Sequence, residues 1–137
     1  HRVDRRQRQM CIRDSFGLHC GWKGIVSGII EKVLSSDNGK DLAYAFLGPH
    51  VSQANFEVQK DLISTLERAN FDTSKALIEK KQAFYLSLRE LCRQKLDNFS
   101  VEIINKESEC SYEKKDKLFS FRRAKAKTSN NITFTWL

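Results

Sequence analysis

Residues 16–34 read FGLHCGWKGIVSGIIEKVL, and this stretch decides the fold class. The apolar run at residues 16–20 is typical of the end of a buried strand, and the glycines that follow it allow a tight turn. Beyond the turn, apolar residues recur at the spacing of a helix with one buried face. These residues are Ile25, Ile29, Ile30, Val33 and Leu34. The stretch therefore predicts a strand, a glycine turn and a helix, which residues 37–39 (DNG) should end.

The rest of the chain continues the mixture of helices and strands. Residues 41–47 form a compact apolar run that suits a central strand. Helices are expected over residues 56–70, with Asn55 as the cap, and over residues 87–97. Between them, residues 72–81 read as a polar connection, with a short helix at 74–78 as one option. The last third favours short β segments, namely residues 101–104, 110–112, 118–121 and 132–136. This mixture predicts a layered α/β or α+β domain.

Composition narrows the class of protein. A chain of 137 residues with 40% hydrophobic residues can bury the core of a single domain. It has neither an apolar run near the ~20 residues of a membrane span nor a signal-peptide core, so we expect a cytoplasmic protein without a membrane partner. The four cysteines lack paired spacing, which favours free thiols. The net charge of +7 is unevenly placed: residues 1–15 hold five Arg against two Asp, and mixed-sign segments follow, so no nucleic-acid partner is expected.

Residues 1–15 differ from the remainder of the chain. They show no strand alternation, no helix cap and no sustained apolar face, which predicts a disordered or loosely attached extension. The string MCIRDS within them also resembles a recurring artefact of translated sequencing adapters. We therefore expect native sequence to begin near Phe16 and the domain to occupy residues 16–137.

Four side chains are candidates for chemistry on their own merits. His19 follows the first expected strand, at the kind of sheet edge where ligand crevices form, and it fits either a zinc ligand or a structural histidine. Cys20 should point to the opposite face and be buried. Arg122 and Arg123 fit either an anion site, through bidentate hydrogen bonds, or a solvated surface pair.

A set of motifs adds a family resemblance. His19-Cys20-Gly21-Trp22-Lys23-Gly24 resembles the H-A-G-W-R-G signature of the YfiH-like family, whose members are known as laccase-domain or polyphenol oxidases and as purine nucleoside phosphorylases. Further elements agree in order and approximate spacing across residues 16–137. They are Gly48-Pro49-His50-Val51-Ser52 with Phe56-Glu57-Val58, Tyr85-Leu86-Ser87-Leu88, Cys110-Ser111-Tyr112, Phe119-Ser120-Phe121-Arg122-Arg123 and Trp136-Leu137.

The resemblance implies a fold and a metal. The fold is the family's own α/β (α+β) layered sandwich, of which this chain would be an N-terminally truncated, C-terminal portion. The metal is zinc, bound by two His and one Cys, and the last of these ligands carries over to His19. The other two ligands would lie upstream of this motif. Copper redox chemistry is disfavoured, because the three histidines of the chain do not supply the ligand clusters of a multicopper oxidase.

The resemblance also implies an activity. Its substrates are a purine nucleoside and phosphate, with phosphorolysis of adenosine or inosine and a possible adenosine deamination. Lys23 and Arg122 would be the catalytic cations, and Arg123 and Glu57 would bind substrate. The chain by itself would be inactive; the alternative is a non-catalytic binding or scaffold domain without a complete metal site. The sequence departs from the family at Ala124, where an acidic residue is usual, which weakens the prediction of fine substrate contacts.

Overall fold

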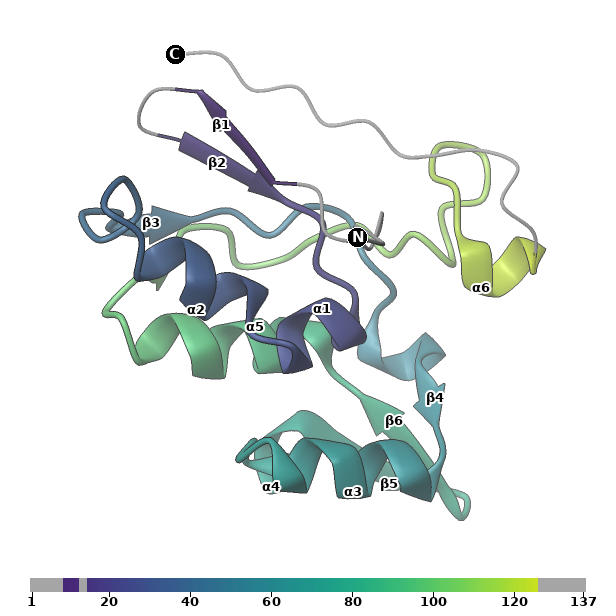
Figure 1. The fold of residues 1–137 in the computed structure, drawn as a ribbon. Coiled ribbons are helices and arrows are strands. Elements are labelled where there is room, and N and C mark those ends of the chain that lie inside the picture. Colours follow the sequence, from purple (N-terminus) through teal and green to yellow (C-terminus); the bar gives the residue numbers. More distant parts are fainter. Residues whose placement is uncertain (1–8, 13–14, 126–137) are drawn as a thin grey trace, which may run out of the picture.

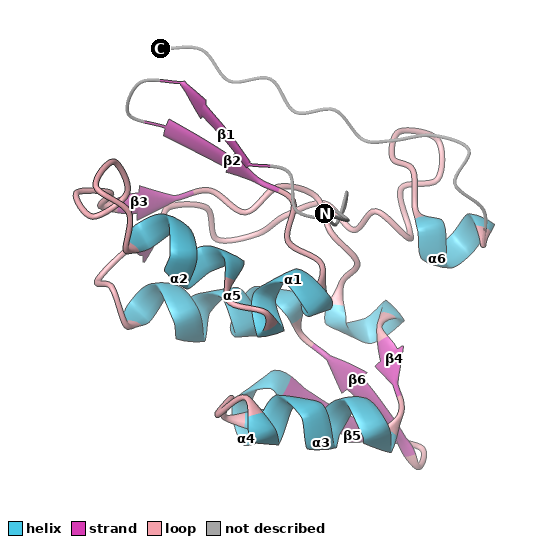
Figure 2. Cartoon of the chain, viewed as in Figure 1, coloured by secondary structure: helices cyan, strands magenta, loops and turns pink. Residues whose placement is uncertain are grey.

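The computed structural model of the protein describes residues 9–12 and 15–125, along which helices and short strands alternate (Figure 1, Figure 2). The strands are β1 (Gln9–Ile12), β2 (Ser15–Leu18), β3 (Tyr44–Ala45), β4 (Glu57–Val58), β5 (Leu77–Lys80), β6 (Ala83–Leu86) and β7 (Glu102–Ile103). The helices are α1 (Trp22–Val26), α2 (Ile29–Leu34), α3 (Lys60–Arg68), α4 (Thr73–Ala76), α5 (Leu88–Asp97) and α6 (Phe121–Ala124), with a 3₁₀ turn at Gln53–Asn55. The expected α+β mixture is confirmed. No helix in these ranges has the length and apolarity needed to cross a membrane.

The strands form small separate sheets. β1 and β2 make an antiparallel hairpin, and β3 pairs with β7 in parallel, with Tyr44 opposite Glu102. β6 lies between β4 and β5, antiparallel to both. A single parallel bridge joins His50 to Cys110. Pairing therefore brings residues 44–50 beside residues 102–110, although these segments lie far apart in the sequence.

The core contains the apolar positions that the sequence predicts. Ile25, Ile29, Ile30, Val33 and Leu34 are all at most 6% exposed. Contrary to the expectation, they belong to two helices. Gly28 separates α1 from α2 because it adopts a φ of 81°, a left-handed conformation that glycine tolerates and that interrupts a helix. In Figure 1, both helices lie against α5.

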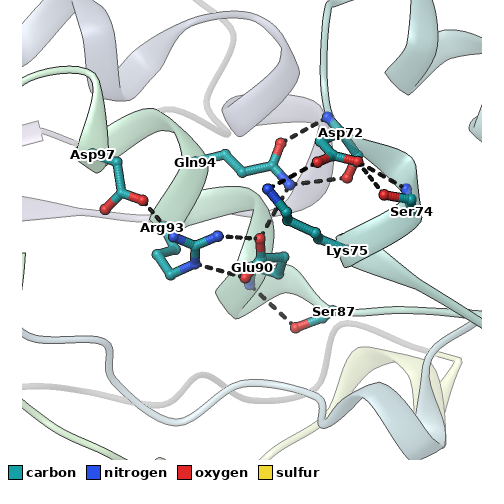
Figure 3. A network of polar contacts seen from close by, with 8 residues as sticks. All are labelled: Asp72, Ser74, Lys75, Ser87, Glu90, Arg93, Gln94 and Asp97. Atoms are coloured by element: carbon teal, nitrogen blue, oxygen red, sulfur yellow. Dashed lines mark hydrogen bonds and ion pairs between the residues drawn. The ribbon is translucent and has the colours of Figure 1, made fainter.

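The helix expected at residues 87–97 is confirmed as α5. Ser87 is its N-cap, and the Ser87 hydroxyl accepts a hydrogen bond from the Glu90 backbone N–H at 3.1 Å. A polar network ties the first turns of α5 to α4 (Figure 3). In it, the Gln94 side chain bonds both the N–H and the carbonyl of Asp72, at 2.9 and 3.0 Å, and Arg93 pairs with Glu90 at 2.6 Å.

Several expected elements are wrong in their bounds. The helix predicted from residue 56 begins only at Lys60, because residues 57–58 pair with β6 as β4, and Asn55 lies in the 3₁₀ turn. Within the connection expected at 72–81, residues 77–80 form β5. The run at 41–47 is no central strand: only Tyr44–Ala45 pairs, and Tyr44 and Phe46 are each 65% exposed.

The ends of the described ranges also differ from expectation. Residues 9–12 form β1, where no strand is predicted, because their backbone pairs with β2. The segment at 118–121 is a loop that enters α6 rather than a strand, and residues 110–112 contribute only the bridge at Cys110. The strand predicted at 132–136 lies outside the described residues.

Candidate functional site

His19 lies between the end of β2 and the start of α1. β2 ends at Leu18 and α1 begins at Trp22, with Gly21 in extended backbone as the N-cap, so a short turn presents His19 at the surface. His19 is exposed, whereas Cys20 is half-buried and packs against the core. Burial raises the pKa of the Cys20 thiol to about 11. The two neighbours therefore point in different directions, as predicted, and Cys20 is a thiol of the interior.

Lys23 lies on the first turn of α1. Its Nζ is 5.4 Å from the centroid of the Trp22 ring, and the residue is exposed. Within the described part of the chain Lys23 makes no ion pair. A solvated ammonium group in this position, one turn from His19, is available to an anion.

Arg122 and Glu57 come together across a long separation in the sequence. Nη2 of Arg122, on α6, donates a hydrogen bond to the Glu57 backbone carbonyl at 2.5 Å. Cζ of Arg122 also lies 4.9 Å from the centroid of the Phe56 ring, within cation–π range. Because β4 alternates, Val58 is buried and the Glu57 side chain is exposed.

Arg123 has different surroundings from its neighbour. Its Nη1 donates to the carbonyls of Ser111 and Tyr112, both at 2.8 Å, and its Nη2 donates to the carbonyl of Leu118 at 2.7 Å. The half-buried guanidinium thus closes the loop at residues 111–118 onto α6. A substrate could use Arg123 only through its remaining N–H groups or by displacing these carbonyls.

The predicted site residues form two groups in the structure. His19 and Lys23 lie around the start of α1, and Arg122, Arg123 and Glu57 lie around α6 and β4. Among the residues described, no hydrogen bond or ion pair links one group to the other. Any common site must therefore be bridged by a ligand or by other parts of the protein.

Comparison with known proteins identifies the family of this chain. The family described as multi-copper polyphenol oxidoreductase laccase matches residues 15–137. The chain belongs to this family. Two curated relatives are named purine nucleoside phosphorylase: YfiH of Escherichia coli, 31% identical over 87% of this chain, and a Haemophilus influenzae protein, 29% identical over 77% of it. This laccase-family chain spans 49% and 45% of those relatives, about half their length.

Two solved structures share the fold of this chain. A Neisseria meningitidis protein of family DUF152 matches with a TM-score of 0.66 at 23% identity, covering 79% of this chain and 46% of its own. A Bacillus licheniformis hypothetical protein, YfiH, matches with a TM-score of 0.64 at 24% identity, covering 80% of this chain and 44% of its own. The α+β fold predicted from the motifs is confirmed as the fold of these proteins.

The laccase family's description implies a metal, so the donor set of this chain can be tested. Among the described residues, no group of three or more His, Cys, Asp or Glu side chains could hold a metal ion. His19 is exposed and offers one imidazole, whereas Cys20 is turned to the core and keeps its proton. These residues do not make a zinc site by themselves. Any metal bound through His19 needs ligands from outside the described residues.

One polar cluster of the laccase-family chain is missed by the sequence reasoning. Cys110 is 7% exposed, and its sulfur accepts hydrogen bonds from the Ser52 N–H at 3.3 Å and from Asn55 Nδ2 at 3.7 Å. Burial by itself would raise the pKa of the Cys110 thiol, but the bonds from Ser52 and from the amides of Glu113 and Tyr112 outweigh it and lower the pKa. In the sequence, only the Cys110-Ser111-Tyr112 motif pointed to this cluster, and it did not indicate that Ser52 and Asn55 donate to the sulfur.

Proposed function

We propose that this chain is part of an enzyme that phosphorolyses purine nucleosides such as inosine and adenosine. One observation supports the proposal: the relatives that match 77–88% of this chain at about 30% identity are named purine nucleoside phosphorylase. In the reaction, the C1′–N9 bond of the nucleoside breaks, a phosphate oxygen bonds to C1′, and the base leaves with a proton. Adenosine deamination is a second activity that we propose for the same site.

The residues of this chain would bind and orient the reactants. Lys23 has a free, exposed ammonium group and would hold the phosphate close to the ribose carbon, where a fixed cation both orients the nucleophile and reduces charge repulsion. Arg122 is the second cation, and its guanidinium bonds the Glu57 backbone carbonyl. The exposed Glu57 carboxylate would accept hydrogen bonds from the nucleoside. We assign Arg123 mainly to holding α6 and the loop at 111–118, because its guanidinium already bonds three carbonyls.

We further propose that His19 is one ligand of a zinc ion. Its exposed position at a strand end, before a glycine turn, supports this role. The described residues do not complete the site, so its other ligands would come from elsewhere in the protein. Zinc bound there would polarise or deprotonate a reacting group. Although the family's description names copper, the three histidines of the chain are too few for the ligand clusters of a multicopper centre.

The test uses the full-length product of the gene, with inosine as substrate. Hypoxanthine should appear in chromatography only when phosphate is supplied, together with an equal amount of ribose 1-phosphate. His19→Ala should lose both the activity and the bound zinc, whereas His50→Gln, whose Nδ1 bonds only the nearby Gly48 carbonyl at 2.8 Å, is the matched histidine control. Protein that carries zinc stoichiometrically and still fails to split inosine with phosphate contradicts the proposal.

A second candidate is a non-catalytic binding or scaffold domain. The observation in its favour is that no group of three or more His, Cys, Asp or Glu among the described side chains could hold a metal ion. The same experiment separates the two candidates. A scaffold domain should bind no zinc at His19, and His19→Ala should leave its metal content and its stability unchanged.

A further inference from the structure

Hydrogen bonds at the start of α6 fix the backbone that carries Arg122. The backbone N–H groups of Arg123 and Ala124 donate to the Ser120 carbonyl, at 3.1 and 3.0 Å, and Ser120 is only 4% exposed. The three carbonyl bonds of Arg123 fix the same turn from its other side. With the neighbour fixed in this way, Arg122 projects from α6 toward β4.

Phe56 is equally well fixed beneath the guanidinium of Arg122. Its N–H donates to the Gln53 carbonyl at 3.1 Å, and its carbonyl accepts from the Leu86 N–H at 2.9 Å. The ring is half-buried and packs against the core. The guanidinium above it has two independent restraints, which are the ring contact at 4.9 Å and the bond to the Glu57 carbonyl at 2.5 Å. These two contacts hold the guanidinium against the ring before any ligand arrives.

We propose that Arg122, supported by Phe56, is a stacking site for the purine base of the nucleoside. The proposal rests on the proposed function and refines the ligand of Arg122. A guanidinium plane stacks well on planar rings, and a base completes a three-layer stack of base, guanidinium and phenyl ring.

The geometry favours a base over phosphate as the ligand of Arg122. Bidentate binding of phosphate uses the N–H edges of a guanidinium, and one of the Arg122 edges is already occupied by the Glu57 carbonyl. Phe121, the preceding residue, is 64% exposed and adds apolar surface at the start of α6.

The test is a titration of the full-length product of the gene, followed by two-dimensional NMR, with inosine, adenosine, ribose 5-phosphate and inorganic phosphate. Inosine and adenosine should shift the signals of Arg122 and of the Phe56 ring, and phosphate should neither shift them nor compete. Arg122→Lys keeps the positive charge but removes the planar guanidinium group, so this variant should bind inosine at least about 5-fold more weakly. Arg68→Lys, another exposed arginine, should bind like the unmodified chain.

The outcomes separate this inference from the proposed function. Equal inosine affinity of Arg122→Lys and the unmodified chain overturns the stacking site, as does competition by phosphate at these signals. Phe56→Leu is a second variant, which removes the ring beneath the guanidinium and should weaken inosine binding in the same direction. A protein that binds inosine through Arg122 but never splits it with phosphate overturns the phosphorylase assignment and leaves the stacking site standing.

Discussion

Replacement of Arg123 by lysine tests whether this residue is a structural anchor. Lysine keeps the positive charge but cannot reach three carbonyls in different directions from one ammonium group. Each of the three bonds contributes about 1 kcal/mol net to the free energy of unfolding, a value at the low end for charged donors because the guanidinium is only half-buried. If lysine keeps one bond, Arg123→Lys should lose about 2 kcal/mol of that free energy.

Urea unfolding measures this loss directly. With a slope of about 2 kcal/mol per molar urea for a chain of this size, the midpoint should fall by about 1 M. Hydrogen exchange should also speed up in the loop at residues 111–118, whose carbonyls lose their donor, while α5 stays protected. Arg122→Lys is the neighbouring control: it loses one carbonyl bond, so its midpoint should move by about half as much or less.

A different result would refute the anchoring role. If Arg123→Lys unfolds at the midpoint of the unmodified chain and the loop exchanges no faster, the three bonds do not stabilise the fold. If that same variant loses nucleoside or phosphate binding, Arg123 is a substrate residue, as the family resemblance implies, and its carbonyl contacts must open when the ligand binds.

Three more perturbations follow from the structure. Gly39→Ala should destabilise the chain by about 1–3 kcal/mol in urea, because an added Cβ would lie 1.9 Å from the Val33 carbonyl oxygen, whereas Gly48→Ala meets no atom within 4 Å and should be close to neutral. Phe46→Ser should reduce the binding of a hydrophobic dye and any self-association of the chain, with little change in unfolding, since Phe46 is 65% exposed in an apolar patch with Tyr44. In iodoacetamide labelling read by mass spectrometry, Cys110, with its lowered pKa, should react at lower pH than Cys20, whose pKa is about 11. Because the unfolded Cys20 thiol ionises near pH 9 and the folded one near 11, its contribution to stability should be complete below about pH 9 and should fall between those values.

The helical spacing of apolar residues predicted the helices that bury a regular apolar face. The buried positions from Ile25 to Leu34 and the helix at residues 87–97 were predictable because the pattern repeats locally and needs no distant partner. The cap predicted at Asn55 was wrong. The strands were less predictable for the opposite reason. Glu57–Val58 reads as the start of a helix, and Leu77–Lys80 reads as a polar loop, until β6 pairs with both. Glu57 pairs with Tyr85, far along the chain, and Leu77 pairs with Leu86 across a hairpin. The local pattern of either strand does not contain its partner.

The site residues also show that a local sequence pattern does not reveal contacts with distant residues. Arg122 and Arg123 are chemically identical neighbours, and the sequence supports the same anion-binding reading for both. Because consecutive residues of a helix point in different directions, the Arg122 side chain contacts Phe56 and β4. The Arg123 side chain instead donates to the carbonyls of the loop at 111–118. The two roles then depend on each other, because the direction of Arg122 is set by the bonds of Arg123. It follows that Arg123→Lys should weaken inosine binding even if Arg123 never touches the nucleoside, and that this loss should scale with the faster exchange of the loop. A loss of binding without any change in loop exchange would place Arg123 in direct contact with the ligand.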